Sequence, residues 1–119
     1  MATLTIQTIN DAGSVPTFSA ATESGDQYLN TGNQFLAIKN AGTESACVVT
    51  ITAQVTSLDL TLYGEVTKAS TTLSVAAGST GFIGGLYTPI FNDASGYAQI
   101  TYSQVESVTI AALINKTQI

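Results

Sequence analysis

The chain has 119 residues, of which 45% are hydrophobic and only 9% are charged, and its net charge is −5. Three lysines without a single arginine exclude the clustered cations that nucleic-acid binding requires. The absence of histidine excludes Ser-His-Asp and Cys-His catalytic arrangements. This length predicts one domain, and so little charge suggests that a partner covers part of its surface.

Residues 3–9 begin the β pattern of the chain. Leu4 and Ile6 alternate with polar residues, and this period of two predicts a strand with one buried face. The strand is either the ordinary first strand of the domain or an arm that adds to the edge of a neighbouring sheet.

Residues 10–33 are rich in Ser, Thr, Gly and Asn, which predicts an irregular segment. The side chains expected to pin it to the core are Val15, Phe18, Tyr28 and Leu29. We therefore divide one compact domain into an N-terminal arm or strand with an irregular segment, residues 1–33, and a β-sandwich core, residues 34–119.

Six further strands are predicted by alternating apolar residues and by abundant Val and Thr, which favour extended backbone. Their ranges are 34–40, 46–55, 58–66, 71–76, 97–103 and 107–114. Residues 40–45 are expected to join the first two of these strands as a hairpin. Short strands at this spacing predict an all-β fold, namely an antiparallel β-sandwich of jelly-roll type with an N-terminal arm or edge strand.

Residues 78–96 combine five glycines with six large apolar side chains, which is unusual for a loop. They are not a phosphate-binding loop, because no Gly-Lys-Ser/Thr pattern is present. Asn92 and Asp93, followed by Gly96, predict an Asx-type turn and lack the ligand spacing of a calcium loop. The apolar side chains must therefore be buried, either in their own domain or against another protein.

Candidate chemistry is scarce in this sequence. Cys47 lies in an apolar run and is interpreted as a small buried side chain. The carboxylates fall mostly in expected loops and turns, where we expect them to be solvated. The first ten residues lack the features of a secretory signal, and no window is apolar enough for a membrane-spanning helix. We expect no catalytic residue, cofactor, metal, nucleic-acid partner or membrane association.

Three stretches within residues 42–114 read GTESACVVTITAQ, STTLSVAAGSTGFIG and FNDASGYAQITYSQVESVTIAALI. In this order and spacing they resemble the small head-decoration, or cement, proteins of tailed bacteriophages. Two features depart from the pattern of that family. Gly85 stands where a proline is expected, and residues 57–70 match no part of the pattern, so the resemblance implies nothing about contacts made there.

The resemblance implies a non-enzymatic virion protein, made in the host cytoplasm, that binds the outer surface of the mature capsid. It implies a homotrimer that clamps neighbouring subunits of the major capsid protein and so stabilises the head. We infer that part of the apolar segment crosses a subunit boundary, the alternative being that all of it is core within one chain. The candidate interface comprises Phe82, Ile83, Leu86, Tyr87, Ile90, Phe91, Leu4 and Ile6.

Two other functions fit an all-β chain of this kind. One is a carbohydrate- or surface-binding β-sandwich module of a phage tail or fibre, although the chain lacks the Trp that stacks best on sugars. The other is a tail or neck adaptor subunit, which would assemble with ring symmetry.

Overall fold

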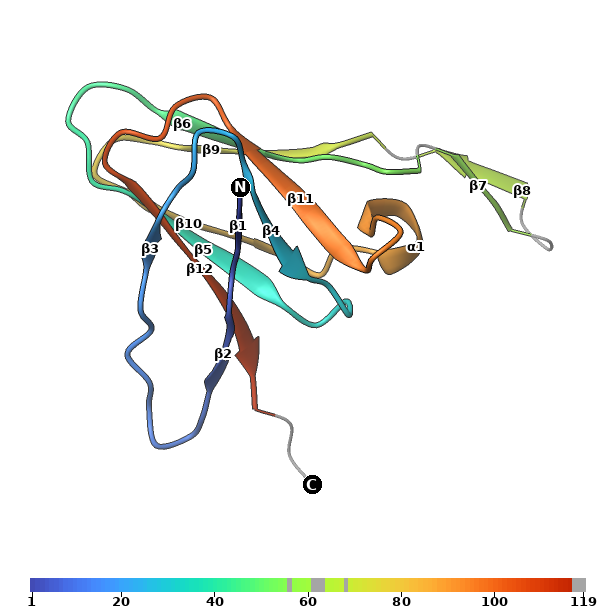
Figure 1. Cartoon of the computed structure of the whole chain (residues 1–119), viewed down its shortest axis with the longest axis horizontal. Coiled ribbons are helices and arrows are strands. Elements are labelled where there is room, and N and C mark those ends of the chain that lie inside the picture. The colour runs from blue at the N-terminus through green and yellow to red at the C-terminus, as the bar shows by residue number, and fades with distance from the viewer. Residues whose placement is uncertain (56, 61–63, 68, 117–119) are drawn as a thin grey trace.

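The computed structural model describes residues 1–55, 57–60, 64–67 and 69–116. Two β-sheets pack face to face, and a separate two-stranded hairpin extends away from them (Figure 1). The strands are β1 (Ala2–Thr3), β2 (Ile6–Ile9), β3 (Ser19–Ala20), β4 (Asp26–Leu29), β5 (Phe35–Asn40), β6 (Cys47–Ile51), β7 (Ser57–Leu60), β8 (Gly64–Thr67), β9 (Thr71–Val75), β10 (Thr80–Gly84), β11 (Tyr97–Tyr102) and β12 (Val108–Asn115). One four-residue helix, α1 (Thr88–Phe91), lies between β10 and β11, and no helix in the described ranges could span a membrane. The all-β prediction is confirmed.

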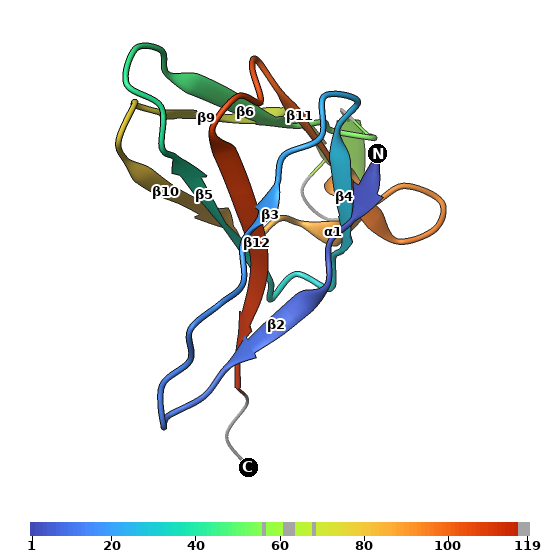
Figure 2. The ribbon, with the colours of Figure 1, turned by 60° about the vertical axis from the view of Figure 1, so that its left-hand side comes forward.

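Sheet A has the strand order β1-β4-β11-β6-β9, and sheet B has the order β10-β5-β12-β2, with β3 also paired to β12. Figure 2 shows the two layers from a second direction. Most pairs are antiparallel, but β1 runs parallel to β4 and β2 runs parallel to β12. The sheets are therefore mixed but mainly antiparallel, and the predicted β-sandwich is confirmed. The strand order does not establish a jelly roll, which stays a prediction.

The N-terminal segment causes both parallel pairings, because it leaves one sheet and enters the other. Its first strand pairs with β4 in sheet A, where the N–H of Leu4 donates to the carbonyl of Gln27 at 2.8 Å. The chain then crosses to β12 in sheet B, and Leu4 is buried at the crossing. The predicted single strand 3–9 is thus two short strands that link the sheets within one chain.

Apolar side chains from the inner faces of both sheets form the main core. Tyr28, Val49, Ile51 and Ile100 come from sheet A, and Leu36, Ile38, Val108 and Ile110 come from sheet B. Burial of a Val or Ile side chain of this size contributes about 1.5–3 kcal/mol to folding. Alternation along β6 and β11 produces this packing, as the sequence predicted, because every second residue of a strand points to the same face.

Residues 10–33 are more ordered than predicted, since they contain β3 and β4. Phe18 and Tyr28 pack against apolar clusters, as expected. Val15 and Leu29 do not, because 97% of Val15 and 47% of Leu29 are exposed.

Residues 41–46 connect β5 to β6, which lie in different sheets, so the predicted hairpin at 40–45 was wrong. Buried Asn40 holds this crossover in place. Its side-chain amide donates to the carbonyls of Ser45 (2.9 Å) and Val75 (3.0 Å), and its side-chain oxygen accepts from the N–H of Gly42 (3.1 Å). A buried amide of this kind replaces the backbone bonds that a hairpin would have supplied.

The segment predicted as one strand at 58–66 is instead the hairpin β7–β8, which makes up a sheet of its own and projects from the sandwich (Figure 1). Residues 61–63 of that prediction lie outside the described residues. The predicted strands 34–40, 46–55, 71–76, 97–103 and 107–114 are confirmed as β5, β6, β9, β11 and β12, with β6 ending earlier than predicted.

Candidate interaction surface

The glycine-rich segment 78–96 forms an edge strand, a sharp bend and one helical turn. Gly85 makes the bend with a φ of +68°, a backbone conformation that side chains other than hydrogen rarely allow. Gly84 pairs with Phe35 so closely that an added Cβ would lie 2.5 Å from the Cβ of Phe35. Gly84 and Gly85 are therefore needed for a close strand approach and a sharp bend, which agrees with the structural role indicated by the sequence.

Two asparagines clamp the segment after this bend against the residue that follows β4. The side-chain amide of Asn30 donates to the carbonyl of Leu86 (3.3 Å) and to the side-chain oxygen of Asn92 (2.8 Å). In return, the side-chain amide of Asn92 donates to the carbonyl of Asn30 (2.8 Å). This reciprocal pair fixes α1 over one end of the sandwich and leaves Tyr87, the residue before α1, directed to the surface.

The candidate residues inferred from the sequence divide into a buried and an exposed set. Leu4, Leu86, Ile90 and Phe91 are buried, while Ile6 and Ile83 are half-buried against the core. Phe82 and Tyr87 are exposed by 63% and 54%. The segment 82–91 thus packs partly under its own sandwich, and within it only Phe82 and Tyr87 are large apolar side chains left exposed.

Phe82 belongs to a larger apolar surface that the sequence analysis missed. We call this surface the outer apolar face; it comprises Ile9, Phe18, Phe35, Ala37, Phe82, Ala111 and Leu113 on and around sheet B. The rings of Phe35 and Phe82 lie 6.4 Å apart between centroids at a tilt of 51°. The nearly continuous apolar runs of β5 and β12 were the available signal, because a strand buried on both faces loses its alternation.

One part of the outer apolar face is covered by the chain itself. The side chain of Gln7 donates to the carbonyl of Thr17 (2.7 Å) and accepts from its N–H (2.8 Å), which holds residues 10–18 beside the sheet. Phe18 follows, with the ammonium of Lys39 4.6 Å from its ring centroid, a favourable cation–π contact. The end of the face that carries Phe82 lacks such a cover and is exposed.

The outer face of sheet A is polar instead. Gln27 donates to the hydroxyl of Thr3 (2.9 Å), and Gln99 donates to Gln27 (2.9 Å) and to Asp93 (2.8 Å). Asp93 also closes the predicted Asx turn, and the N–H of Tyr97 is the main contact that holds the pKa of its carboxyl below the ordinary value. These groups satisfy one another, although Leu29 and Val48 also expose apolar surface on this face.

One carboxylate departs from the expectation that the acids are solvated. Asp26 is fully buried and accepts hydrogen bonds from the phenol of Tyr102 (2.7 Å) and from the N–H groups of Ala2 and Thr22 (3.2 Å each). Burial, followed by the contact with Asp26, raises the pKa of Tyr102 well above its ordinary value. This pair joins three segments of the chain and is enclosed, which suits a structural role.

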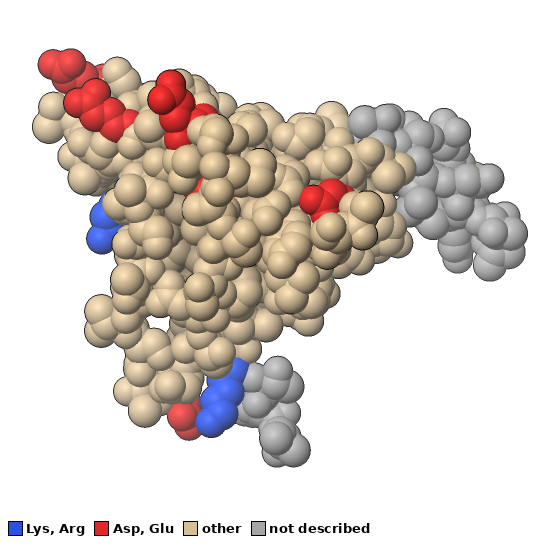
Figure 3. All heavy atoms as spheres, in the orientation of Figure 1, with Lys and Arg blue, Asp and Glu red and all other residues tan. Residues whose placement is uncertain are grey.

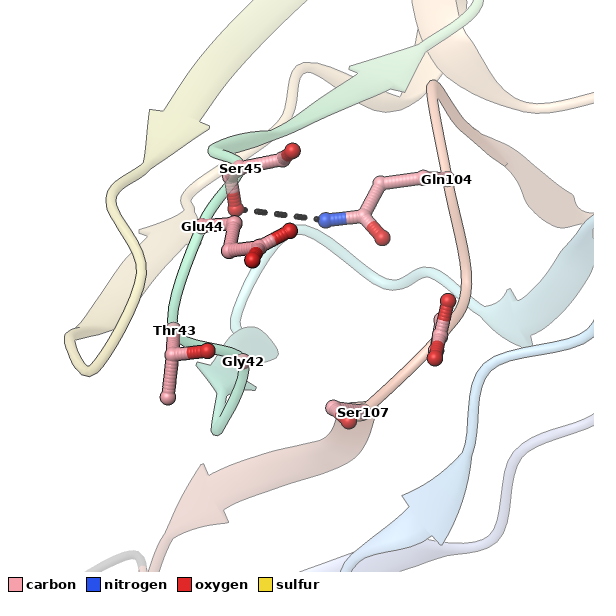
Figure 4. A pocket seen from close by; sticks show the side chains of 7 residues that line it. Gly42, Thr43, Glu44, Ser45, Gln104 and Ser107 are labelled. Carbon is pink, nitrogen blue, oxygen red and sulfur yellow. Dashed lines mark hydrogen bonds between the residues drawn. The ribbon is translucent and has the colours of Figure 1, made fainter.

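Acidic side chains gather at one end of the molecule, and the remainder of the face in Figure 3 carries little charge. A hollow of about 160 Å³ opens at that end between the β5–β6 and β11–β12 connections. Glu44 and Glu106 line it, and the side-chain amide of Gln104 spans it to the carbonyl of Ser45 at 3.3 Å (Figure 4). Within the described residues no three His, Cys, Asp or Glu side chains are grouped to hold a metal.

Comparison with known proteins yields no match to a family model, to a curated protein or to a solved structure.

Proposed function

We propose that the chain is a non-enzymatic decoration protein of a phage head, which binds the outer surface of the capsid and clamps neighbouring major capsid subunits. The observation that supports a binding role is the exposed end of the outer apolar face, where the ring of Phe82 contacts the ring of Phe35 in a tilted arrangement. Large aromatic side chains exposed beside an apolar surface are typical of protein interfaces. The resemblance of residues 42–114 is what points to a phage head as the partner.

The proposed binding surface consists of Phe82 with Phe35, and of Tyr87 on its clamped bend. Both positions are rigid, because Phe82 lies on a strand paired with β5 and Tyr87 precedes a turn held by Asn30 and Asn92. Rigid aromatic anchors bind at a low cost in conformational entropy. Association with copies of itself, which the resemblance gives as a homotrimer, is part of the proposal.

Binding to purified heads that lack this chain tests the proposal. Heads mixed with the purified chain and sedimented should retain it at a copy number of the same order as the coat protein. Tyr87→Ser should weaken retention by about fivefold or more, because truncating an interface anchor typically costs above ~1 kcal/mol. Thr101→Ser, at an exposed position of the polar face of sheet A, is the matched control and should bind as the wild type does.

Failure of the wild-type chain to sediment with any head preparation would contradict the proposal. Retention on glycans instead of heads would favour the carbohydrate-binding alternative.

A further inference from the structure

We propose that β10 pairs in antiparallel fashion with β10 of a second copy of this chain, about a twofold axis beside Phe82. The pairing would merge sheet B of two copies into one continuous sheet. This twofold contact differs from the trimer that the resemblance implies, and it uses Phe82, which the proposed head-binding surface also contains. It does not depend on which particle the chain binds.

The free edge of β10 follows from its pairing with β5. The carbonyl of Ser79 accepts from the N–H of Asn40 (3.0 Å), and the N–H of Gly85 donates to the carbonyl of Gln34 (3.4 Å). Residues of an antiparallel strand alternate between facing the partner strand and facing away from it. The odd-numbered residues of β10 therefore bond to β5, and the even-numbered ones direct their N–H and C=O groups away from the sheet. These open groups belong to Thr80, Phe82 and Gly84.

Nothing in the described part of the chain covers this edge. β10 is the terminal strand of sheet B, its even-numbered residues are exposed, and no backbone bond from another described element reaches them. Natural edge strands are usually protected by a charge, a proline or a cover. The sequence TGFIG contains neither a charged residue nor a proline. An unprotected edge of this kind is a site for strand addition.

The two sheets differ in what their neighbouring edges present. β9 is also terminal, in sheet A, but its exposed positions are Thr72 and Ser74. β10 instead presents Phe82, which continues the outer apolar face at its exposed end. Of these two strands, only β10 therefore combines open backbone groups with an exposed apolar side chain.

The occupant that we infer is a second copy, because the open positions are self-complementary. They are centred on Phe82, so a second β10 running antiparallel places Phe82 opposite its own equivalent and Thr80 opposite Gly84 of the second copy. Each opposed pair exchanges two hydrogen bonds, which satisfies every open group. The lack of a side chain at Gly84 leaves room for Thr80, and Phe82 extends the Phe35–Phe82 contact into a cluster of four rings.

Charge does not oppose this contact, although the chain is acidic. β5 and β10 contain no Asp or Glu, and Lys39 is their only charged residue. Lys39 pairs with Thr80, at one end of β10, so the two lysines of a dimer would lie at opposite corners of the contact. The edge therefore lacks acidic side chains, although the chain as a whole carries a net charge of −5. A five-residue edge is small compared with the ~1,600 Å² that a standard interface buries, so we expect a reversible dimer.

Cysteine cross-linking of the purified full-length chain, without phage particles, tests the contact and its register. Directly opposed residues lie about 5.5 Å apart between Cα atoms, within the range of a disulfide. Phe82→Cys should therefore form a covalent dimer under mild oxidation. Thr80→Cys should not, because the two equivalent positions would be offset by four residues, about 13 Å. Leu29→Cys, at an exposed position outside the proposed binding surface, is a second control, and the native Cys47 is buried.

Sedimentation equilibrium should show a mass that rises with concentration from one chain of 12.3 kDa to two. Phe82→Lys, which puts two ammonium groups on the axis, should abolish the rise, while Thr72→Lys on β9 should leave it unchanged. The proposal would be overturned by a strictly monomeric wild type at about 1 mM, by Thr80→Cys cross-linking as fast as Phe82→Cys, or by an assembly that persists in Phe82→Lys. Should Phe82→Lys fail to fold, the cysteine series decides alone. Because Phe82 also belongs to the proposed head-binding surface, head binding is measured separately with Tyr87→Ser, which lies outside the edge of β10.

Discussion

The phenol of Tyr102 on β11 donates a hydrogen bond of 2.7 Å to the buried carboxylate of Asp26 on the neighbouring strand β4, although the two residues are 76 positions apart in the chain. The same carboxylate accepts the N–H groups of Ala2 and Thr22, so it fixes the N-terminal strand and the turn before β4 to the centre of sheet A. A carboxylate enclosed in this way is costly unless all its contacts are kept.

A double-mutant cycle should show strong coupling between these two residues. Asp26→Asn turns one acceptor into a donor that faces other donors and should cost about 2–4 kcal/mol of unfolding free energy. Tyr102→Phe should cost about 1–2 kcal/mol. Urea unfolding of both single variants and of the double variant gives the coupling, which we expect to exceed ~1 kcal/mol. Strictly additive effects would show that the hydrogen bond contributes nothing to stability.

Tyr28 offers a stabilising substitution. Its side chain is fully buried in the main core, and its hydroxyl has no hydrogen-bond partner in the described structure. Tyr28→Phe removes this unpaired group and should raise the unfolding free energy by about 1 kcal/mol at neutral pH. A variant less stable than the wild type in urea unfolding would mean that the hydroxyl has a partner, such as a buried water.

The same residue should affect stability at high pH. Burial raises the pKa of Tyr28 to about 12, above the value of about 10 in the unfolded chain. The contribution of the protonated phenol is fully present below pH ~10 and is lost as the pH rises towards ~12, because the unfolded chain ionises first. The advantage of Tyr28→Phe should therefore widen over this window, which a series of urea titrations from pH 8 upward would reveal. A stability difference between Tyr28→Phe and the wild type that stays constant with pH would contradict this prediction.

Two glycines of β10 should differ in their tolerance of a methyl group. An added Cβ at Gly84 would lie 2.5 Å from the Cβ and 2.8 Å from the Cα of Phe35, and this backbone cannot move without breaking the sheet. At Gly81 the nearest atom, 2.9 Å away, is the end of the flexible Leu73 side chain. We expect Gly84→Ala to cost about 3 kcal/mol and Gly81→Ala about 1 kcal/mol. Equal melting temperatures for the two variants would contradict this geometry.

Asp93 should stabilise the fold near neutral pH and lose this effect in acid. Its pKa is lowered in the folded chain, chiefly by the N–H of Tyr97, so its contribution is present above the unfolded-state value of ~3.9 and is lost as the pH falls through the lower folded value. The unfolding free energy of Asp93→Asn should therefore be lower than that of the wild type at pH 6, and the two values should converge below pH ~3. Glu23→Gln, in an exposed loop, is the matched control. A difference in unfolding free energy between the variant and the wild type that persists unchanged to pH 2 would mean that ionisation of Asp93 is not its cause.

Strands were predicted correctly from the sequence where one face of the strand is buried and the other is exposed to solvent. β6 and β11 alternate for this reason, and their inward residues are in the core, as predicted. β10 was not predicted because glycines at positions 81 and 84 are typical of loops. In the structure these glycines are required because Leu73 lies close to Gly81 and Phe35 lies close to Gly84. The parallel pairing of β1 and β2 has no local signal, because it depends on where the chain crosses between sheets.

The candidate surface was predictable only in part. The apolar content of residues 82–91 indicated burial, but the sequence could not tell Phe82 and Tyr87 from Leu86, Ile90 and Phe91. That division depends on the bend at Gly85 and on the clamp formed by Asn30, which lies 56 residues away from Leu86 in sequence. Long-range contacts of this kind are set by the fold and leave no pattern in a short window.

The proposal that this chain decorates a phage head is tested most directly by its copy number in purified virions. Quantitative mass spectrometry should find it at a ratio to the major capsid protein of the same order as one, as expected for a protein that tiles the shell. A few copies per particle would place it at the tail or neck instead. Its complete absence from virions would contradict a structural role.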